Sequence, residues 1–353
     1  MKERTKEAIR DGFGQLVSNA SAMRGAKAGP LWLTILFFVF ALLLPIIPIF
    51  VSQVTTNGST FLNTYSYNLD RTVTYVAMEL KNTRNVEFSI GNDHLLSITE
   101  GENQINFSEY GNEKKIFAAY TSYFNNDPAH PEYELVVYLS DAETDKQKET
   151  FLNEVKAINF TLDSITPTES TESVYHPNTI VLFRSGIYVS IYANNATTLI
   201  ANSFLGDFKT VDANGACLES LLKVEGVAQN MYDDHYTMGV YKNFKKFLDK
   251  SYETLKIKNT GLTCLIYFGI FFGASLLMAL IMFLLTRGKN NPNNYFSFWL
   301  CLKIQARLSF CPGLLAMIIG FFLTSQIPLF FIMFLGLRVM WVSMKELRPI
   351  SNN

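Results

Sequence analysis

The stretch that decides the fold runs from Leu31 to Phe50, LWLTILFFVFALLLPIIPIF, 20 consecutive residues without a charged side chain. At about 1.5 Å per residue, a helix of this length spans roughly 30 Å, the hydrocarbon thickness of a bilayer. A cleaved signal peptide would have a shorter apolar core, about 7–15 residues, and a small-residue cleavage site. The stretch therefore predicts a retained transmembrane helix over 31–53, which Pro45 and Pro48 should bend or end early.

Two later stretches are also strongly apolar. The first, GLTCLIYFGIFFGASLLMALIMFLLT at 261–286, is uncharged throughout and predicts a second transmembrane helix. The second, from 310 to 342, is too long for one crossing and is interrupted by TSQIP at 324–328, where polar residues and Pro328 indicate a tight turn. We therefore expect a helical hairpin over 310–344, with one helix on each side of that turn. A buried helix pair in a soluble protein is the alternative, which the apolar lengths disfavour.

The charged residues indicate how the chain is threaded. Residues 54–260 carry 17 basic and 27 acidic side chains, whereas the rest of the chain carries 13 basic and 4 acidic ones. Lys and Arg accumulate on the cytoplasmic side of membrane spans. Three separate basic segments fall on the same predicted side of the membrane: 1–30, the linker at 287–309 and the tail at 345–353. The sequence predicts a multi-pass protein of the cell membrane, with both termini cytoplasmic and residues 54–260 extracellular.

Residues 54–260 are numerous enough to form a domain with its own core. Strand-like runs lie at 86–90, 134–139, 179–183 and 186–192, the last two joined by a hairpin turn at Arg184-Ser185. After Ser140-Asp141, which we expect to cap a helix, four apolar residues recur at helical spacing: Phe151, Leu152, Val155 and Ile158. Helical spacing also marks both flanks of the domain, at 61–80 and 241–255.

The predicted fold class is therefore an α-helical integral membrane protein, with four transmembrane helices and an inserted extracytoplasmic α+β domain. The single cysteine of that domain, Cys217, excludes an internal disulfide. This is typical of a bacterial surface rather than of a disulfide-rich ectodomain.

The predicted cytoplasmic segments are amphipathic. In the N-terminal segment, one helical face would hold Ile9, Phe13, Leu16, Val17, Ala20 and Met23. This face is compatible with a helix in the membrane interface and equally with a helix packed on another cytoplasmic element of the protein. The run YFSFWLCLKIQARLSF at 295–310 is apolar but carries Lys303 and Arg307. We expect both side chains to extend to the same side of the helix, so that their charges lie near the lipid headgroups. It should lead into the third membrane helix through a kink at Pro312 and Gly313.

No residue pattern predicts catalysis. The chain has no Walker loop, no G-x-S-x-G and no H-E-x-x-H, and its four histidines are scattered. We therefore predict no catalytic residue, no metal site and no cofactor, and the net charge of −1 disfavours nucleic-acid binding. No acid lies in a predicted membrane helix, which argues against a stand-alone coupled transporter. Arg338 is the one charge inside a predicted span, either as a structural anchor or as a functional contact.

Several segments resemble one bacterial family. They are VEFSIGNDHLLSI at 86–98, ELVVYLS at 134–140, TIVLFRSGIYVSIY at 179–192 and IQARLSFCPGLLA at 304–316. With the order of elements, they resemble the domain-of-unknown-function family known as maltodextrin-utilisation membrane protein MalA, and the membrane half is more remotely similar to Yip1-like membrane domains. The resemblance implies one N-terminal membrane helix, an outer α+β domain and a C-terminal helix group. It implies no reaction and no site residue, and this outer domain is longer than the family leads us to expect.

The sequence thus predicts a sensing or accessory component linked to a transport system, which the resemblance connects with maltodextrin utilisation. Its partners would be the lipid bilayer, a membrane transport complex and an extracellular carbohydrate ligand, for which stacking aromatic residues are the usual means. A structural or assembly factor that uses its helix bundle as the interaction surface is the alternative. An envelope enzyme is a third reading, which the lack of motifs disfavours.

Overall fold

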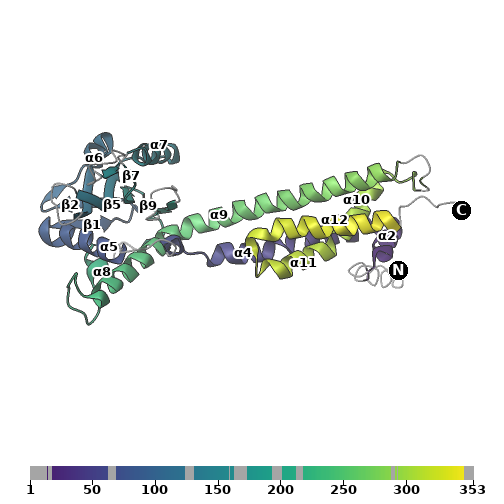
Figure 1. Cartoon of the computed structure of the whole chain (residues 1–353), viewed down its shortest axis with the longest axis horizontal. Coiled ribbons are helices and arrows are strands. Elements are labelled where there is room, and N and C mark those ends of the chain that lie inside the picture. The colour runs from purple at the N-terminus through teal and green to yellow at the C-terminus, as the bar shows by residue number, and fades with distance from the viewer. Residues whose placement is uncertain are drawn as a thin grey trace, which may run out of the picture. The chain divides into compact units, whose positions relative to one another are not determined.

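The chain forms two compact units in a computed structural model (Figure 1). One is Thr56–Ile257, here called the α+β unit, and the other combines Met1–Thr55 with Lys258–Asn353, here called the helical unit. The structure describes residues 14, 18–62, 69–123, 131–158, 160–162, 173–192, 201–211, 218–287, 291 and 293–345.

The helical unit contains the apolar helices expected from the sequence. Its elements are α2 (Asn19–Ala28), α3 (Leu31–Leu43), α4 (Ile46–Thr55), the later part of α9 (Asp234–Leu285), α10 (Phe298–Leu308), α11 (Phe310–Gly320), the 3₁₀ turn η4 (Thr324–Gln326) and α12 (Ile327–Lys345). Among the described residues, four helical segments are long and apolar enough to cross a membrane: Leu31–Thr55, Asp234–Leu285, Phe298–Gly320 and Thr324–Lys345.

Proline shapes two of these segments as expected. Pro45 lies in the break between α3 and α4, because a proline inside a helix removes one backbone hydrogen bond and crowds the preceding turn. The chain nevertheless stays helical past Pro48 to Thr55. Pro328 is the second residue of α12, where the missing N–H would have had no helical partner.

The third apolar segment of the structure, Phe298–Gly320, begins within the predicted linker over 287–309. Ser297 caps α10 by accepting a hydrogen bond from the Leu300 N–H at 3.2 Å, and only Ser309 separates α10 from α11. Helix α10 thus leads directly into the helix that follows it, as expected for the run at 295–310. Arg307 is buried, so its charge does not interrupt the outward apolar surface of α10.

The described part of the N-terminal segment packs on the helical unit. Helix α2 buries Ala22, Met23 and Ala26 in a cluster shared with α9, α10 and α12. Of the two alternatives for this segment, the packing of α2 on α10, a helix of the predicted cytoplasmic linker, favours the second. The remainder of the predicted face, at Ile9, Phe13, Leu16 and Val17, lies outside the described residues.

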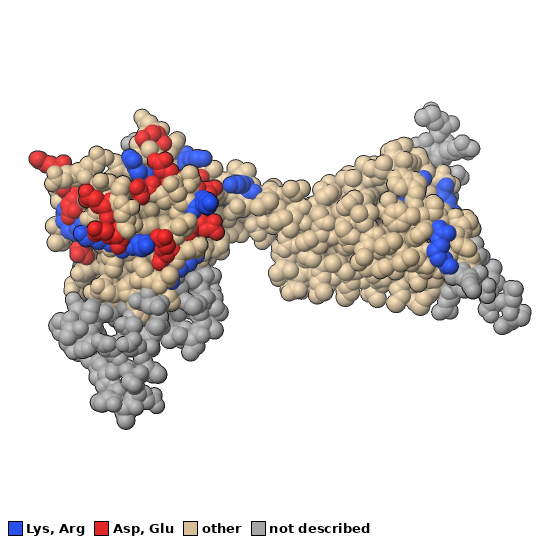
Figure 2. All heavy atoms as spheres, turned by 90° about the horizontal axis from the view of Figure 1, so that it is seen from above, with Lys and Arg blue, Asp and Glu red and all other residues tan. Residues whose placement is uncertain are grey.

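The surface of the helical unit matches a lipid environment. Large apolar side chains point outward along its helices, among them Trp32 at 61 % and Phe322 at 83 % exposure. In Figure 2 most of the visible face of this unit is free of charge, and basic side chains gather at one end of it. So large an exposed apolar surface is unfavourable in water, so the unit fits a membrane better than an aqueous phase.

The α+β unit is built on a five-stranded sheet with the order β10-β9-β8-β5-β4. Its strands are β4 (Ile116–Tyr123), β5 (Pro131–Ser140), β8 (Asn178–Phe183), β9 (Gly186–Tyr192) and β10 (Ala201–Asp207). Only β5 and β8 pair in parallel, and α7 (Asp145–Lys156) lies between them in the chain. The smaller sheets are β1 (Val86–Ile90), β2 (Leu96–Glu100) and β3 (Asn103–Gln104), and β6 (Phe160–Leu162) with β7 (Ser173–Tyr175).

Both faces of the main sheet are covered, because successive side chains of a strand point to opposite faces. Along β5, Val136 and Tyr138 face the cluster beneath α7, whereas Leu135, Val137 and Leu139 face a larger core. That core is closed by α5 (Leu69–Met78), the π-helical turn η2 (Glu79–Thr83), α8 (Leu218–Leu222), the first part of α9 and the β1-β2 sheet (Figure 1). The 3₁₀ turn η1 (Gly58–Leu62) and α6 (Phe107–Glu113) complete the unit.

Most of the strands and helices predicted in this unit are present. The hairpin turn at Arg184-Ser185 is confirmed, since Phe183 pairs with Gly186 across it. The predicted cap of α7 was wrong: Thr144 and Gln147 form the capping box instead of Ser140-Asp141. Residues 141–143 lie between the end of β5 at Ser140 and the N-cap of α7 at Thr144. Burial on α7 lowers the pKa of Lys148, whose Nζ donates to Ser185 Oγ at 2.7 Å.

Candidate functional site

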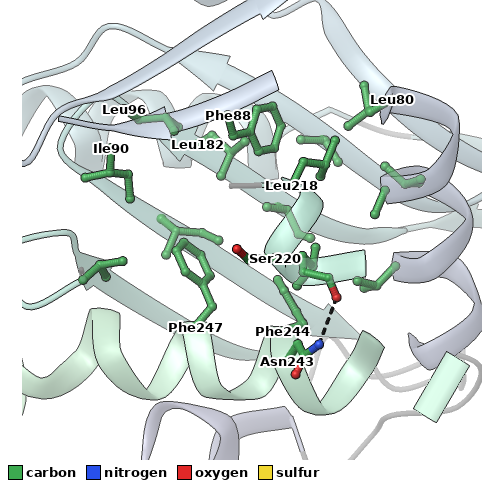
Figure 3. Close-up of a pocket in the computed structure, with 18 of the residues that line it drawn as sticks. Leu80, Phe88, Ile90, Leu96, Leu182, Leu218, Ser220, Asn243, Phe244 and Phe247 are labelled. Atoms are coloured by element: carbon green, nitrogen blue, oxygen red, sulfur yellow. Dashed lines mark hydrogen bonds between the residues drawn. The ribbon is translucent and has the colours of Figure 1, made fainter. Parts of the chain in front are cut away.

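A cavity of about 260 Å³ lies inside the larger core of the α+β unit. It lies between the main sheet and the layer formed by α5, α8 and α9 (Figure 3). Strands contribute Leu135, Val137, Ile180, Leu182 and Ile187 to its wall, and the helices contribute Val73, Val76, Ala77, Leu80, Leu218, Phe244 and Phe247. The cavity thus arises where the inward faces of sheet and helices do not fill the space between them.

The wall of the cavity is almost entirely hydrocarbon. Figure 3 shows Phe88, Phe244 and Phe247 beside aliphatic side chains, with Ser220 and Asn243 as polar members. The Asn243 amide is already engaged, because its Nδ2 donates to the carbonyl oxygens of Leu221 at 3.1 Å and of Lys223 at 2.9 Å. No acidic side chain lines the cavity among the described residues. The wall therefore offers contact to apolar groups and few free hydrogen-bond partners.

The cavity meets solvent at one edge. Of its lining residues, only Lys246 and Lys250 are exposed, one helical turn apart on α9. Within the described part of the chain, Lys246 forms no ion pair or hydrogen bond, and the Lys250 ammonium lies 3.7 Å from the Glu253 carboxylate. The opening is therefore basic, in a unit whose sequence is acidic overall.

An empty hollow of this size is costly. Apolar surface that faces water instead of protein costs about 25 cal/mol per Å², so the hydrocarbon wall of the cavity lowers the free energy of unfolding while it stays uncovered. Apolar cavities also tend to stay dry, since water finds no hydrogen-bond partners in them. Occupation by an apolar ligand would recover much of this energy, which makes the cavity the candidate binding site.

The aromatic residues that the structure describes do not assemble a sugar platform. In this part of the α+β unit, Tyr232 is the only strongly exposed aromatic side chain. Others pack on one another in the core, as Phe61, Phe204 and Tyr252 do. Within the described ranges, the predicted carbohydrate ligand therefore has no stacking face. Nor do three metal-ligating side chains converge in the described parts of the chain.

In the helical unit, two of the predicted residues act together. Pro312 has no N–H, so the Leu308 carbonyl lacks its usual partner four residues on. Arg338 Nη1 donates to that carbonyl oxygen at 3.0 Å, and Arg338 Nε donates to Asn19 Oδ1 at 3.1 Å. The kink was expected at Pro312 and Gly313, and the helix break lies about one turn earlier, at Ser309. Arg338 thus ties α12 to α2 and to the α10–α11 junction, a structural role.

Arg307 is placed differently from the prediction. It is only 1 % exposed and does not reach toward a surface; its Nε donates to Thr34 Oγ1 at 3.0 Å. Gly25 on α2 and Gly29, directly after the helix, leave room for its guanidinium, because a Cβ at either position would overlap it. Hydrophobic periodicity could not predict this burial, since a buried arginine and an exposed one have the same spacing along a helix. The two glycines four residues apart were the available signal.

The remaining predicted residues have local roles. Lys303 is half-buried and holds its ammonium 5.9 Å from the Trp299 ring centroid. Gly313 lets α11 approach α3, since a Cβ there would overlap the carbonyl oxygen of Ala41. Pro328 begins α12. None of these residues belongs to the cavity of the α+β unit, which sequence reasoning did not anticipate.

We predict that Ala77→Leu is tolerated or stabilising, because the added carbons enter the cavity and bury apolar area worth about 1–2 kcal/mol. Ala118→Leu is the matched control: Ala118 is buried in the same core but does not line the cavity. Overpacking there should cost about 1–3 kcal/mol. Thermal unfolding of the full chain in lipid nanodiscs measures both, and an equal loss in the two variants would show that the space is already filled by protein.

A second prediction concerns Gly313. Gly313→Ala should lower the melting temperature by several degrees, because the new methyl group meets the backbone of α3 and overpacking costs about 1–3 kcal/mol. Gly269→Ala, in the apolar part of α9 with no atom within 4 Å of the new Cβ, should be neutral or slightly stabilising. Identical melting curves for the two variants would refute the close approach of α11 and α3.

Comparison with protein-family models, curated proteins and solved structures finds no match for this chain. The candidate site therefore stands on the chain's own geometry, and the resemblance to the MalA-type family stays a prediction.

Proposed function

We propose that this chain is a multipass membrane protein whose α+β unit lies outside the cell, binds a small ligand in its cavity and acts as a sensing or accessory component of a transport system. The observation that carries the proposal is the apolar cavity of about 260 Å³ at the centre of the α+β unit. Sites for small molecules are typically concave, largely apolar and preformed, with a few polar groups at defined places.

The membrane part of the proposal rests on the four apolar helices and the charge distribution. All basic segments outside the α+β unit fall on one predicted side of the membrane, and that side is the cytoplasm by the usual bias of Lys and Arg. The polar contacts of Arg307 and Arg338 explain how two charges fit within apolar segments, since both side chains turn inward.

Within this proposal, α9 is the element that a ligand would act on. Its residues Phe244 and Phe247 line the cavity, and the same continuous helix, Asp234–Leu285, includes the second apolar segment. A ligand that binds one conformation of the wall more tightly than another shifts their populations by its difference in affinity. A connection with maltodextrin utilisation stays an expectation from resemblance, and the hydrocarbon wall favours a ligand other than a sugar inside the cavity.

The topology is tested with cysteines placed on the two predicted sides. The test uses a chain in which Cys217, Cys264, Cys301 and Cys311 are replaced by alanine. In this chain we expect Lys146→Cys, at an exposed position of α7, to react with an impermeant maleimide in intact cells. Lys345→Cys, at the end of α12, should react only after lysis. Labelling of position 345 but not of position 146 in intact cells would reverse the proposed orientation.

Ligand binding is tested by thermal unfolding of the full chain in nanodiscs against sugars, oligosaccharides, peptidoglycan fragments and small amphiphiles. A ligand at about 100 times its Kd should stabilise the protein by about 2.7 kcal/mol. Ala77→Phe, which occupies the cavity, should abolish the shift. No stabilisation by any compound, together with reproducible co-purification of a membrane partner, would favour the assembly-factor alternative.

A further inference from the structure

We propose that the cavity takes the hydrocarbon chain of a medium-chain carboxylate, with the carboxylate at Lys246 and Lys250. The inference rests on the proposed ligand-binding function and names the chemistry of its ligand. Three properties of the cavity define that chemistry: its hydrocarbon wall, the lysines at its solvent-exposed edge and its volume.

The hydrocarbon wall favours a ligand chain without polar substituents. The Asn243 Nδ2 already donates to two backbone carbonyls, and apart from Asn243, Ser220 and the two lysines the wall is hydrocarbon. A ligand hydroxyl or amide along the rest of the wall would therefore lose its water without a replacement. An unpaired buried polar group is strongly unfavourable. Oligosaccharides and peptides carry such groups along their whole length, whereas an alkyl chain carries none.

The edge selects a negative head group. Lys246 and Lys250 are the exposed members of the lining set, and no described acidic residue belongs to that set. Of the nearby acids of α9, Asp249 is engaged elsewhere, since its Oδ1 accepts from the Ser59 N–H at 2.7 Å, whereas Glu253 lies 3.7 Å from the Lys250 ammonium. A carboxylate at the edge would meet Lys246, which has no partner within the described residues, and would compete with Glu253 for Lys250.

The volume limits the length of the chain. An apolar cavity of about 150 Å³ holds benzene, which has six carbons. By the same measure, the cavity of about 260 Å³ holds about ten carbons, a single chain of medium length. A phospholipid with two long acyl chains exceeds the space several-fold, so a single-chain acid fits and a bilayer lipid does not.

The test uses the full chain in nanodiscs of zwitterionic phospholipid, with a photoreactive, alkyne-tagged decanoate as probe. After irradiation, mass spectrometry should find the label on peptides containing Phe244, Phe247 or Ala77, and unlabelled decanoate should compete it away. Decanol, which has the same chain without charge, should compete at least about fivefold more weakly, because exposed charge pairs each contribute modestly. Maltotriose should not compete.

Variants separate the head group from the cavity. The double variant Lys246→Ala with Lys250→Ala should weaken competition by decanoate about fivefold and leave decanol unchanged. Lys242→Ala is the matched control, since Lys242 is exposed one turn earlier on α9 and does not line the cavity. Ala77→Phe should remove the label from the wall while other parts of the chain stay labelled.

The outcomes are distinct for the two proposals. Equal competition by decanoate and decanol, with no effect of the lysine variants, would overturn the carboxylate assignment and leave ligand binding intact. Absence of label from the cavity wall would also overturn it. In that case, a cavity-dependent thermal shift by a different compound would still support the proposed function, and no shift by any compound would remove both.

Discussion

The exclusion of charge from the outward surface of the apolar helices is the constraint on which the helical unit depends. Arg307 and Arg338 lie on helices whose outer faces are hydrocarbon, and both turn inward to oxygen acceptors on Thr34, Asn19 and the Leu308 carbonyl. An uncompensated guanidinium away from water is costly, so these acceptors from neighbouring helices stabilise the inward positions of both arginines.

The α+β unit meets a different constraint, that of filling both faces of one sheet. Under α7 the side chains of β5 and β8 pack closely, as Tyr138, Val181 and Phe183 do. On the other face, a sheet and three helices of different directions leave about 260 Å³ unfilled. Protein interiors are usually packed as densely as organic crystals. An unfilled volume of this size is therefore unusual, and a bound ligand would complete the packing.

The contrast between the predicted and observed positions of Arg307 shows where sequence reasoning ends. Hydropathy identified the apolar segments, and the proline breaks followed from the missing N–H groups at Pro45, Pro312 and Pro328. The third apolar segment begins at Phe298, inside the predicted linker over 287–309, because the buried Arg307 does not interrupt its apolar surface. Hydropathy cannot show that a basic side chain is buried. The strands of 179–192 were predicted because alternation and a two-residue turn are local properties.

The sequence by itself determined the four apolar segments, the acidic α+β insertion and most of its strands, since length, charge and periodicity are local quantities. Only the tertiary structure decided which face of each helix is buried, that Leu308 and Arg338 meet, and that Ala77, Val137 and Phe244 enclose a common space. These features depend on residues far apart in the chain. A cavity in particular is the space that side chains leave between them, and no single segment encodes it.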